Sequence, residues 1–237
     1  MQPTESVADV GEFRVNYASA GKGESVLLLH ASDRREDWHV WEPMIPLFDG
    51  YSLLMPDMVG FGKSSVPEET PDYVVQARVM KDLLDRLSVK RVNLIGMGWG
   101  GQVALELALN WPDAVRSIVL LASTYSREQV GRLKNLRKPT LIMYAEDDMV
   151  TPLKAGYLLR DAIRTSRLEV MDPVARESRH GLSTSHRLER FRAPLVLQMV
   201  RLFLSKPEAM VAEPPEMENE LRGLALKEEG SEVTSRP

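Results

Sequence analysis

Short, mainly apolar segments alternate along this chain with longer segments in which apolar residues recur at helical spacing. The apolar segments span 26–29, 51–55, 92–95, 117–121, 140–144 and 168–171, and a strand-like segment at 13–18 precedes them. Helical spacing is found at 38–48, 73–87, 101–110, 153–163 and 188–204. Strands without polar alternation are buried on both faces. The pattern therefore predicts an α/β fold, a mostly parallel central sheet with helices on both faces.

This pattern ends near residue 205. The segment 206–237 contains 8 acidic and 4 basic residues, four prolines and no aromatic residue. Such a composition buries too little apolar surface to offset the entropy cost of ordering. We expect residues 1–205 to form one domain and residues 206–237 to form an acidic, largely disordered tail, with a short helix at 217–226 as an alternative for part of it.

Composition narrows the classes of function. Hydrophobic residues make up 43% of the 237 residues, the formal net charge is -4, and there is no cysteine. Disulfides and thiol chemistry are therefore excluded, and the absence of a Lys/Arg run argues against nucleic acid as a partner. No apolar run approaches the 18 residues of a transmembrane helix. The first residues also lack the basic segment and the following apolar segment of a secretory signal peptide. We expect a cytoplasmic protein that neither spans nor binds a membrane.

A glycine-rich turn at 96–101, with the sequence G-M-G-W-G-G, joins the apolar segment 92–95 to the helical segment 101–110. Three further motifs occur where predicted strands end. These are L-L-L-H-A at 27–31, D-M-V-G-F-G-K-S at 57–64 and A-E-D-D-M-V-T-P at 145–152.

In their order along the chain, the four motifs resemble those of the α/β-hydrolase superfamily, and the resemblance covers about residues 12–205. The family has L-L-H-G, D-x-x-G-x-G-x-S, a nucleophile elbow G-x-S-x-G-G and G-x-x-D-x-x-x-P at the corresponding places. The resemblance implies an α/β-hydrolase fold that needs neither a cofactor nor a metal. The connection after 117–121 has only about 15 residues, which is too short for the cap domain of many family members.

The resemblance also implies where a Ser-Asp-His triad would lie, and there the chain departs from the family. The elbow position of the serine is Gly98, so the nucleophile position is vacant. The acid maps to Asp148, for which capping of the next helix is an equally good role. The histidine maps to His186, with His180 as a rival, and an exposed loop histidine without a role is the alternative for both.

The implied oxyanion hole would use the backbone N–H of Trp99 and a second N–H from Ala31 or Ser32. Ala31 replaces a family glycine, so its methyl group could partly fill the hole. His30 matches a family position at which histidine is generally structural.

Glycine at the apex keeps the turn at little conformational cost but removes the hydroxyl that the turn presents. No acyl-enzyme can form at residue 98. Alternative nucleophiles are Ser32, on the loop that would supply the oxyanion hole, and Ser123 and Ser126, which follow the segment 117–121. Ordinary turn chemistry explains serines at such places equally well. A water molecule activated by His186 and Asp148 is another route.

Two hypotheses follow. The first is a non-catalytic α/β-hydrolase-fold protein, a pseudoenzyme that binds a small apolar ligand or a protein partner. The alternative is a hydrolase of ester or acyl substrates with a non-standard, water-mediated mechanism that uses Asp148 and His186. An inactivating substitution in an ordinary hydrolase is a third reading. A metal site at His180 and His186 is the weakest, because their spacing matches no known ligand pattern.

Overall fold

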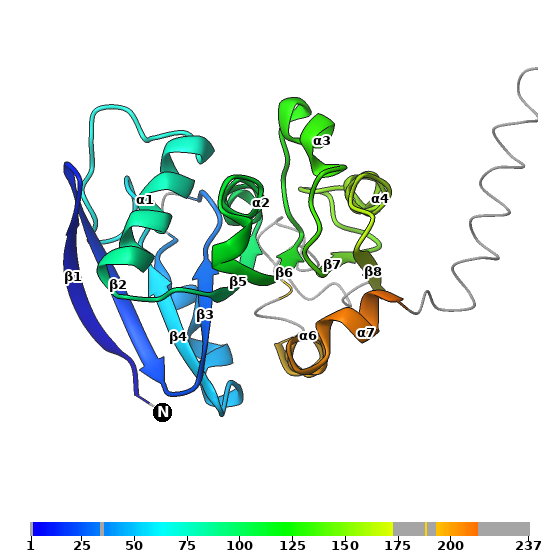
Figure 1. Ribbon diagram of the computed structural model, residues 1–237, viewed down its shortest axis with the longest axis horizontal. Coiled ribbons are helices and arrows are strands. Elements are labelled where there is room, and N and C mark those ends of the chain that lie inside the picture. The colour runs from blue at the N-terminus through cyan, green and yellow to red at the C-terminus, as the bar shows by residue number, and fades with distance from the viewer. Residues whose placement is uncertain (1, 34–35, 173–187, 189–192, 213–237) are drawn as a thin grey trace, which may run out of the picture.

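The computed structural model describes residues 2–33, 36–172, 188 and 193–212. These form an eight-stranded sheet in the order β1-β2-β4-β3-β5-β6-β7-β8, flanked by helices (Figure 1). The strands are β1 (Thr4–Val10), β2 (Phe13–Gly21), β3 (Glu24–Leu29), β4 (Tyr51–Pro56), β5 (Val92–Met97), β6 (Val115–Leu121), β7 (Thr140–Ala145) and β8 (Ser166–Met171). The predicted α/β fold is confirmed.

The sheet is parallel from β4 through β8, and only the pairs that β2 forms with β1 and β4 are antiparallel. The carboxyl ends of β3 to β8 therefore meet at one edge of the sheet. In open α/β sheets, ligands bind outside this edge. All four motifs singled out in the sequence begin at or beside these strand ends.

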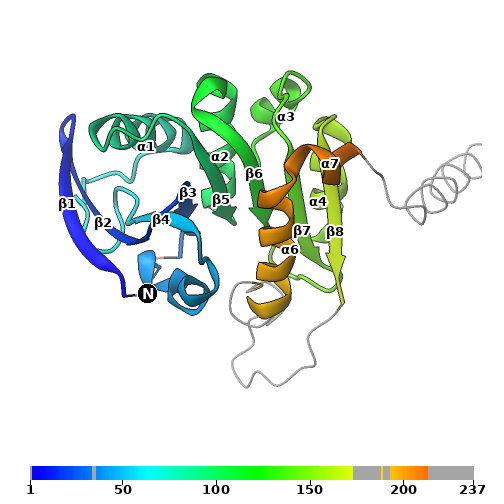
Figure 2. The same cartoon turned by 60° about the horizontal axis from the view of Figure 1, so that its bottom comes forward.

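Helices cover both faces of the sheet (Figure 2). One apolar cluster joins the sheet to α1 (Tyr73–Arg86), α2 (Trp99–Asn110), α3 (Arg127–Leu133) and α4 (Leu153–Ala162). A second cluster, on the opposite face, joins it to the 3₁₀ helix η1 (Trp38–Leu47) and to α6 (Ala193–Ser205). The short elements η2 (Pro112–Ala114) and α7 (Pro207–Ala212) complete the fold.

Three elements differ from the sequence expectation. The segment expected as an ordinary helix at 38–48 is a 3₁₀ helix, since Pro43 and Pro46 inside it lack the N–H that α-helical hydrogen bonds require. Strand β1 was not expected because only Ala8 and Val10 of it are buried. Helix α3 was missed because most of its residues are polar.

Helix α7 lies inside the segment that we expected to be largely disordered. Its Met210 and Val211 are partly buried against the second cluster, next to β7 and β8. The expectation of disorder is therefore wrong for 207–212, because these two apolar residues find a place on the core. The remainder of the tail, including 217–226, lies outside the described residues, and the boundary at residue 205 stays a prediction.

The D-x-x-G-x-G-x-S loop after β4 is a structural clamp. The buried Asp57 carboxylate accepts hydrogen bonds from the Asn16 side chain at 2.8 Å and from the backbone N–H groups of Trp38 and Lys63, each at 2.9 Å. The Ser64 hydroxyl donates to the Asp57 carbonyl at 2.6 Å. One carboxylate thus ties β2, η1 and this loop together beside the carboxyl edge.

Candidate functional site

The turn between β5 and α2 is sharp and strained in the way that the sequence predicts. Gly98 has φ 51° and ψ -118°, a conformation that side chains with a Cβ rarely adopt. Its N–H donates to the Leu121 carbonyl at 3.0 Å, and its own carbonyl accepts from the Thr124 N–H at 2.9 Å. The end of β6 therefore fixes the apex of the turn from both sides.

The flanking glycines are required by close packing. A Cβ on Gly100 would lie 2.2 Å from the Leu29 carbonyl oxygen, and one on Gly101 would lie 2.2 Å from the Ser123 hydroxyl. A Cβ on Gly96 would lie 2.5 Å from the Cα of Gly101. These contacts leave room for nothing larger than hydrogen, so α2 can begin directly against β3 and β5.

Ala31 faces the apex from the end of β3. A Cβ on Gly98 would lie 2.9 Å from the Cβ of Ala31 and 3.8 Å from its Cα. The first distance is shorter than real Cβ atoms tolerate, and the Ala31 methyl is attached directly to the backbone, so it cannot rotate away. The methyl group thus occupies the space next to the position where a side chain at residue 98 would start.

His30 is structural, as the sequence suggests. It is fully buried, its Nδ1 lies 2.6 Å from the Ala31 carbonyl oxygen, and its Nε2 accepts from the Met58 N–H at 3.0 Å. Burial lowers the pKa of His30, and the hydrogen bond to Ala31 only partly opposes this. A neutral ring with its proton on Nδ1 satisfies both bonds and fixes the Ala31 backbone.

The two backbone donors expected for an oxyanion hole lie on these two loops. Trp99 is the first residue of α2, so its N–H has no acceptor within the helix. The centroid of its half-buried ring lies 6.0 Å from that of the Phe61 ring. The Phe61 centroid in turn lies 5.2 Å from the centroid of the His30 ring. Ser32 is exposed in the bend after β3. Whether these groups act together on a ligand oxygen stays a prediction.

Asp148 is buried in the loop after β7, the second strand along from β5. Its Oδ1 accepts from the N–H groups of Val150 at 2.7 Å and Thr151 at 3.0 Å, and its Oδ2 accepts from the Thr151 hydroxyl at 2.8 Å. These bonds close a turn within the loop, before Pro152, and α4 has no side-chain cap and no acidic residue in its first turn. The expected capping role of Asp148 is therefore wrong. These bonds also hold the carboxylate in one orientation, which a triad role would need.

Two of the alternative nucleophiles have structural duties. Ser123 is buried and its hydroxyl donates to the Thr124 carbonyl at 2.9 Å. Ser126 caps α3, accepting from the Gln129 N–H at 3.1 Å, and lies 3.0 Å from the Tyr73 hydroxyl. The Tyr144 hydroxyl donates to the Ser123 carbonyl, and its pKa is raised by burial and then by the nearby Asp148 charge.

His180 and His186 lie outside the described residues, so the expected histidine is not placed by the structure. Within the described part, the sequence missed Thr124, which bonds Gly98 through its backbone and whose hydroxyl lies 3.2 Å from the Gln102 side chain. The sequence indicated a role for Thr124 only through its position, three residues after the end of β6. No group of three His, Asp or Glu side chains suited to a metal occurs among the described residues.

Comparison with known proteins agrees with this geometry. The family model described as the alpha/beta hydrolase fold matches residues 25–136. A predicted CIB-like hydrolase from Thermoplasma acidophilum has a solved structure that superposes with a TM-score of 0.76 over 86% of this chain and 98% of that one, at 23% identity. The chain has the α/β-hydrolase fold.

Two curated hydrolases are similar to part of this chain. A 2-hydroxy-6-oxo-6-phenylhexa-2,4-dienoate hydrolase of Comamonas testosteroni is 32% identical over 120 residues, 49% of this chain and 42% of that protein. A soluble epoxide hydrolase of a Corynebacterium species is 31% identical over 50% of this chain and 41% of that protein. The matches thus span less than half the length of these relatives. The similarity to these hydrolases is therefore confined to about half of this chain.

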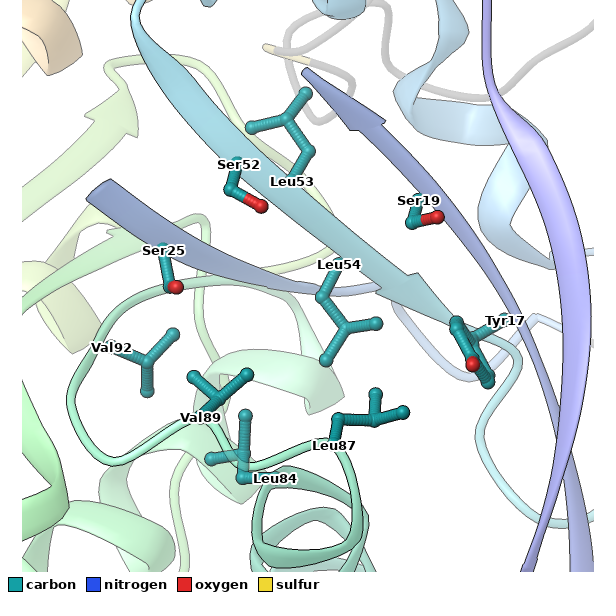
Figure 3. Close-up of a pocket in the computed structure, with 10 residues that line it drawn as sticks. All are labelled: Tyr17, Ser19, Ser25, Ser52, Leu53, Leu54, Leu84, Leu87, Val89 and Val92. Atoms are coloured by element: carbon teal, nitrogen blue, oxygen red, sulfur yellow. The ribbon is translucent and has the colours of Figure 1, made fainter. Parts of the chain in front are cut away.

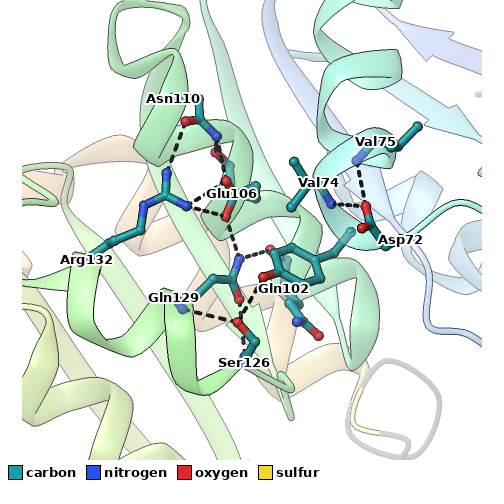
Figure 4. Close-up of polar contacts among 10 residues, drawn as sticks. Asp72, Val74, Val75, Gln102, Glu106, Asn110, Ser126, Gln129 and Arg132 are labelled. Atoms are coloured by element: carbon teal, nitrogen blue, oxygen red, sulfur yellow. Dashed lines mark hydrogen bonds and ion pairs between the residues drawn. The ribbon is translucent and has the colours of Figure 1, made fainter.

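In this α/β-hydrolase fold, no separate cap domain lies between β6 and β7, where α3 is the only helix. Polar side chains of α3 bind α2 (Figure 4). The buried Glu106 carboxylate accepts from Arg132 at 2.8 Å, from Gln129 at 3.1 Å and from Asn110 at 2.7 Å. The polar composition of this connection therefore reflects a buried network between two helices.

No helix in the described part of the chain is long and apolar enough to cross a membrane.

Proposed function

We propose that this protein is a non-catalytic member of the α/β-hydrolase superfamily, which uses the carboxyl edge of the sheet to bind a small apolar ligand or an apolar segment of a protein partner. The observation that carries the proposal is the fit between Gly98 and Ala31. The apex lacks a side chain, and the methyl of Ala31 stands 2.9 Å from where one would begin.

Glycine at residue 98 and alanine at residue 31 both depart from the family pattern. Together they support loss of the nucleophile more strongly than either substitution alone. A serine at residue 98 would need both the strained backbone and space beside Ala31. The backbone conformation is present, but the space is reduced. Without a side-chain oxygen at the apex, the covalent route of the family's triad has no starting point.

The surroundings of this edge support a binding role. Val66, Val74 and Val75 lie in the segment that follows β4, and Met149 and Val150 lie in the loop after β7; all five are exposed, Met149 at 84% and Val66 at 75%. Both segments follow strands that end at the carboxyl edge, where ligands bind in open α/β sheets.

The proposal is tested with an active-serine probe and an esterase substrate. The full chain should show no labelling by a fluorophosphonate and no hydrolysis of p-nitrophenyl acetate above the rate of the heat-denatured protein. Labelling of the native chain at any serine would overturn the proposal. Gly98→Ser combined with Ala31→Gly should gain labelling, whereas Gly98→Ser alone should gain less, because only the pair restores both hydroxyl and space.

A second candidate function is hydrolysis by water attack, and it is favoured by the hydrolase names of the relatives and by the fixed Asp148 carboxylate. His186 would take a proton from water while the water oxygen attacks an ester carbonyl, with Asp148 orienting the histidine. The tetrahedral intermediate would then break its C–O bond to the alcohol, and His186 would return the proton to the leaving alkoxide. This candidate requires measurable hydrolysis by the native chain that Asp148→Asn and His186→Gln each abolish. His39→Gln is the matched control, because His39 is exposed and pairs with Asp37.

A further inference from the structure

A cavity lies at the edge of the sheet opposite the candidate site, between the starts of the parallel strands and the end of α1 (Figure 3). Its volume is about 210 Å³. The floor is the sheet face that carries α1, with Ser19 of β2, Ser25 of β3 and Ser52 of β4, and the wall is formed by Leu84 and Leu87. None of these residues belongs to the candidate site.

The floor carries hydroxyl groups where neighbouring strands carry apolar core residues. Ser25 and Ser52 are register partners in the parallel pair β3 and β4, so their side chains lie side by side on one face. Within the described part of the chain, neither hydroxyl has a hydrogen-bond partner, and both residues are only half-buried. They can therefore donate to or accept from a small molecule without breaking an existing bond.

The wall is shaped by a strained turn at the end of α1. Ser88 has φ 58°, which is unusual for a residue with a side chain, and the Val89 N–H donates to the Leu84 carbonyl at 2.8 Å. This turn ends the helix and directs the chain back toward β5, so Leu87 and Val89 both line the cavity. The helix stops before it covers the serines, and the cavity stays open at that point.

We propose that this cavity is a binding site for a small uncharged amphiphile, a single ring or short chain with one hydroxyl or carbonyl group. An apolar cavity of about 150 Å³ holds benzene, so this cavity accommodates one ring with a small substituent. All ten lining residues are serine, tyrosine, leucine or valine. Because no charged side chain lines the cavity, burial of a charged ligand group there would be uncompensated.

The test uses phenol as the probe and the full chain with labelled leucine and valine methyl groups. Phenol should shift the NMR signals of Leu84, Leu87, Val89 and Val92 in a saturable manner. Val89→Trp, which fills the cavity mouth, should abolish these shifts. The matched control is Val170→Trp, at a 43% exposed position of β8 distant from the cavity, and it should leave them unchanged.

The hydroxyl floor is tested separately, because filling a cavity blocks any ligand. The double variant Ser25→Ala, Ser52→Ala should weaken phenol binding by roughly fivefold to tenfold, the loss expected for one neutral hydrogen bond. Benzene, which lacks the hydroxyl, should bind the native chain correspondingly more weakly than phenol, and benzoate should bind more weakly still.

Four results would overturn the proposal. These are absence of saturable phenol shifts in the native chain, phenol shifts that persist in a folded Val89→Trp variant, equal affinity for benzene and phenol, and tighter binding of benzoate than of phenol. If Val89→Trp fails to fold, Leu87→Trp replaces it, since Leu87 is also half-buried at the wall. None of these measurements involves the candidate site at the carboxyl edge.

Discussion

The Cβ of Ala31 lies 2.9 Å from the point that a Cβ on Gly98 would occupy. The two residues are far apart in sequence and follow adjacent parallel strands, β3 and β5. In the resembling family, the first position is a glycine and the second a serine. The resemblance implies that a serine side chain at residue 98 fills this space in the family, whereas here the Ala31 methyl group occupies it. Glycine at residue 98 therefore leaves room for the methyl group of Ala31.

This relationship predicts a measurable coupling between the two positions. Gly98→Ala should lower the free energy of unfolding by about 2–4 kcal/mol, because it combines the positive φ with a clash. In an Ala31→Gly background the same substitution should cost at least about 1 kcal/mol less, since contacting residues couple by such amounts. Urea unfolding of the four proteins in the cycle measures this coupling.

The matched control for that cycle is Gly131→Ala in α3. A Cβ there meets nothing within 4 Å, and its backbone is helical. The substitution should be neutral or stabilise by up to about 1 kcal/mol, through helix propensity. Additive costs for Gly98→Ala and Ala31→Gly would contradict the proposed fit.

The clamp around Asp57 gives a second prediction. A Cβ on Gly62 would lie 2.3 Å from the Asp57 carboxylate, whereas one on Gly11 would meet nothing within 4 Å, although both have similar positive φ values, 51° and 57°. Gly11→Ala should therefore cost about 1 kcal/mol from backbone strain alone. Gly62→Ala should cost at least about 2 kcal/mol more, because it displaces a buried charge from its donors. Thermal and urea unfolding measure the loss of stability in each variant. Equal losses for Gly11→Ala and Gly62→Ala would contradict the role of the clamp.

A third prediction concerns the network between α2 and α3. Arg132→Met should destabilise the protein by about 1–3 kcal/mol, because it removes the cation next to the buried Glu106. Adding Glu106→Gln should recover part of this loss, since it removes the uncompensated charge. The exposed pair Arg14–Asp9 is the control, and Arg14→Met should change stability by at most about 0.5 kcal/mol. A further loss of stability on adding Glu106→Gln would argue against this account.

A fourth prediction follows from the lowered pKa of His30. The folded protein keeps this buried ring neutral, while the unfolded chain protonates it below its ordinary pKa of 6.5. The unfolded state therefore binds more protons as pH falls through 6.5, and stability decreases in that direction. Between about pH 7.5 and 5.5, His30 should account for a loss of about 1 kcal/mol. His30→Gln, which keeps a donor and an acceptor, should show a pH dependence smaller by that amount in urea unfolding.

The layer architecture and the place of the turn can be predicted from the amino-acid sequence. Mainly apolar segments specify buried parallel strands, and a glycine-rich run between strand and helix specifies a sharp turn, because both signals are local. The same locality explains what was missed. Strand β1 is stabilised by pairing with β2, and α3 by its contacts with α2, and neither interaction leaves a periodic signal in the segment itself.

How residues of different motifs contact one another depends on the folded arrangement of the strands. The sequence identified Gly98 and Ala31 as separate departures from the family, but their 2.9 Å relationship depends on how β3 and β5 pair. In the same way, Ser25 and Ser52 are unremarkable along the chain and become neighbours through strand register. Residue type is local information, whereas a shared space between two residues exists only once the sheet has brought their strands together.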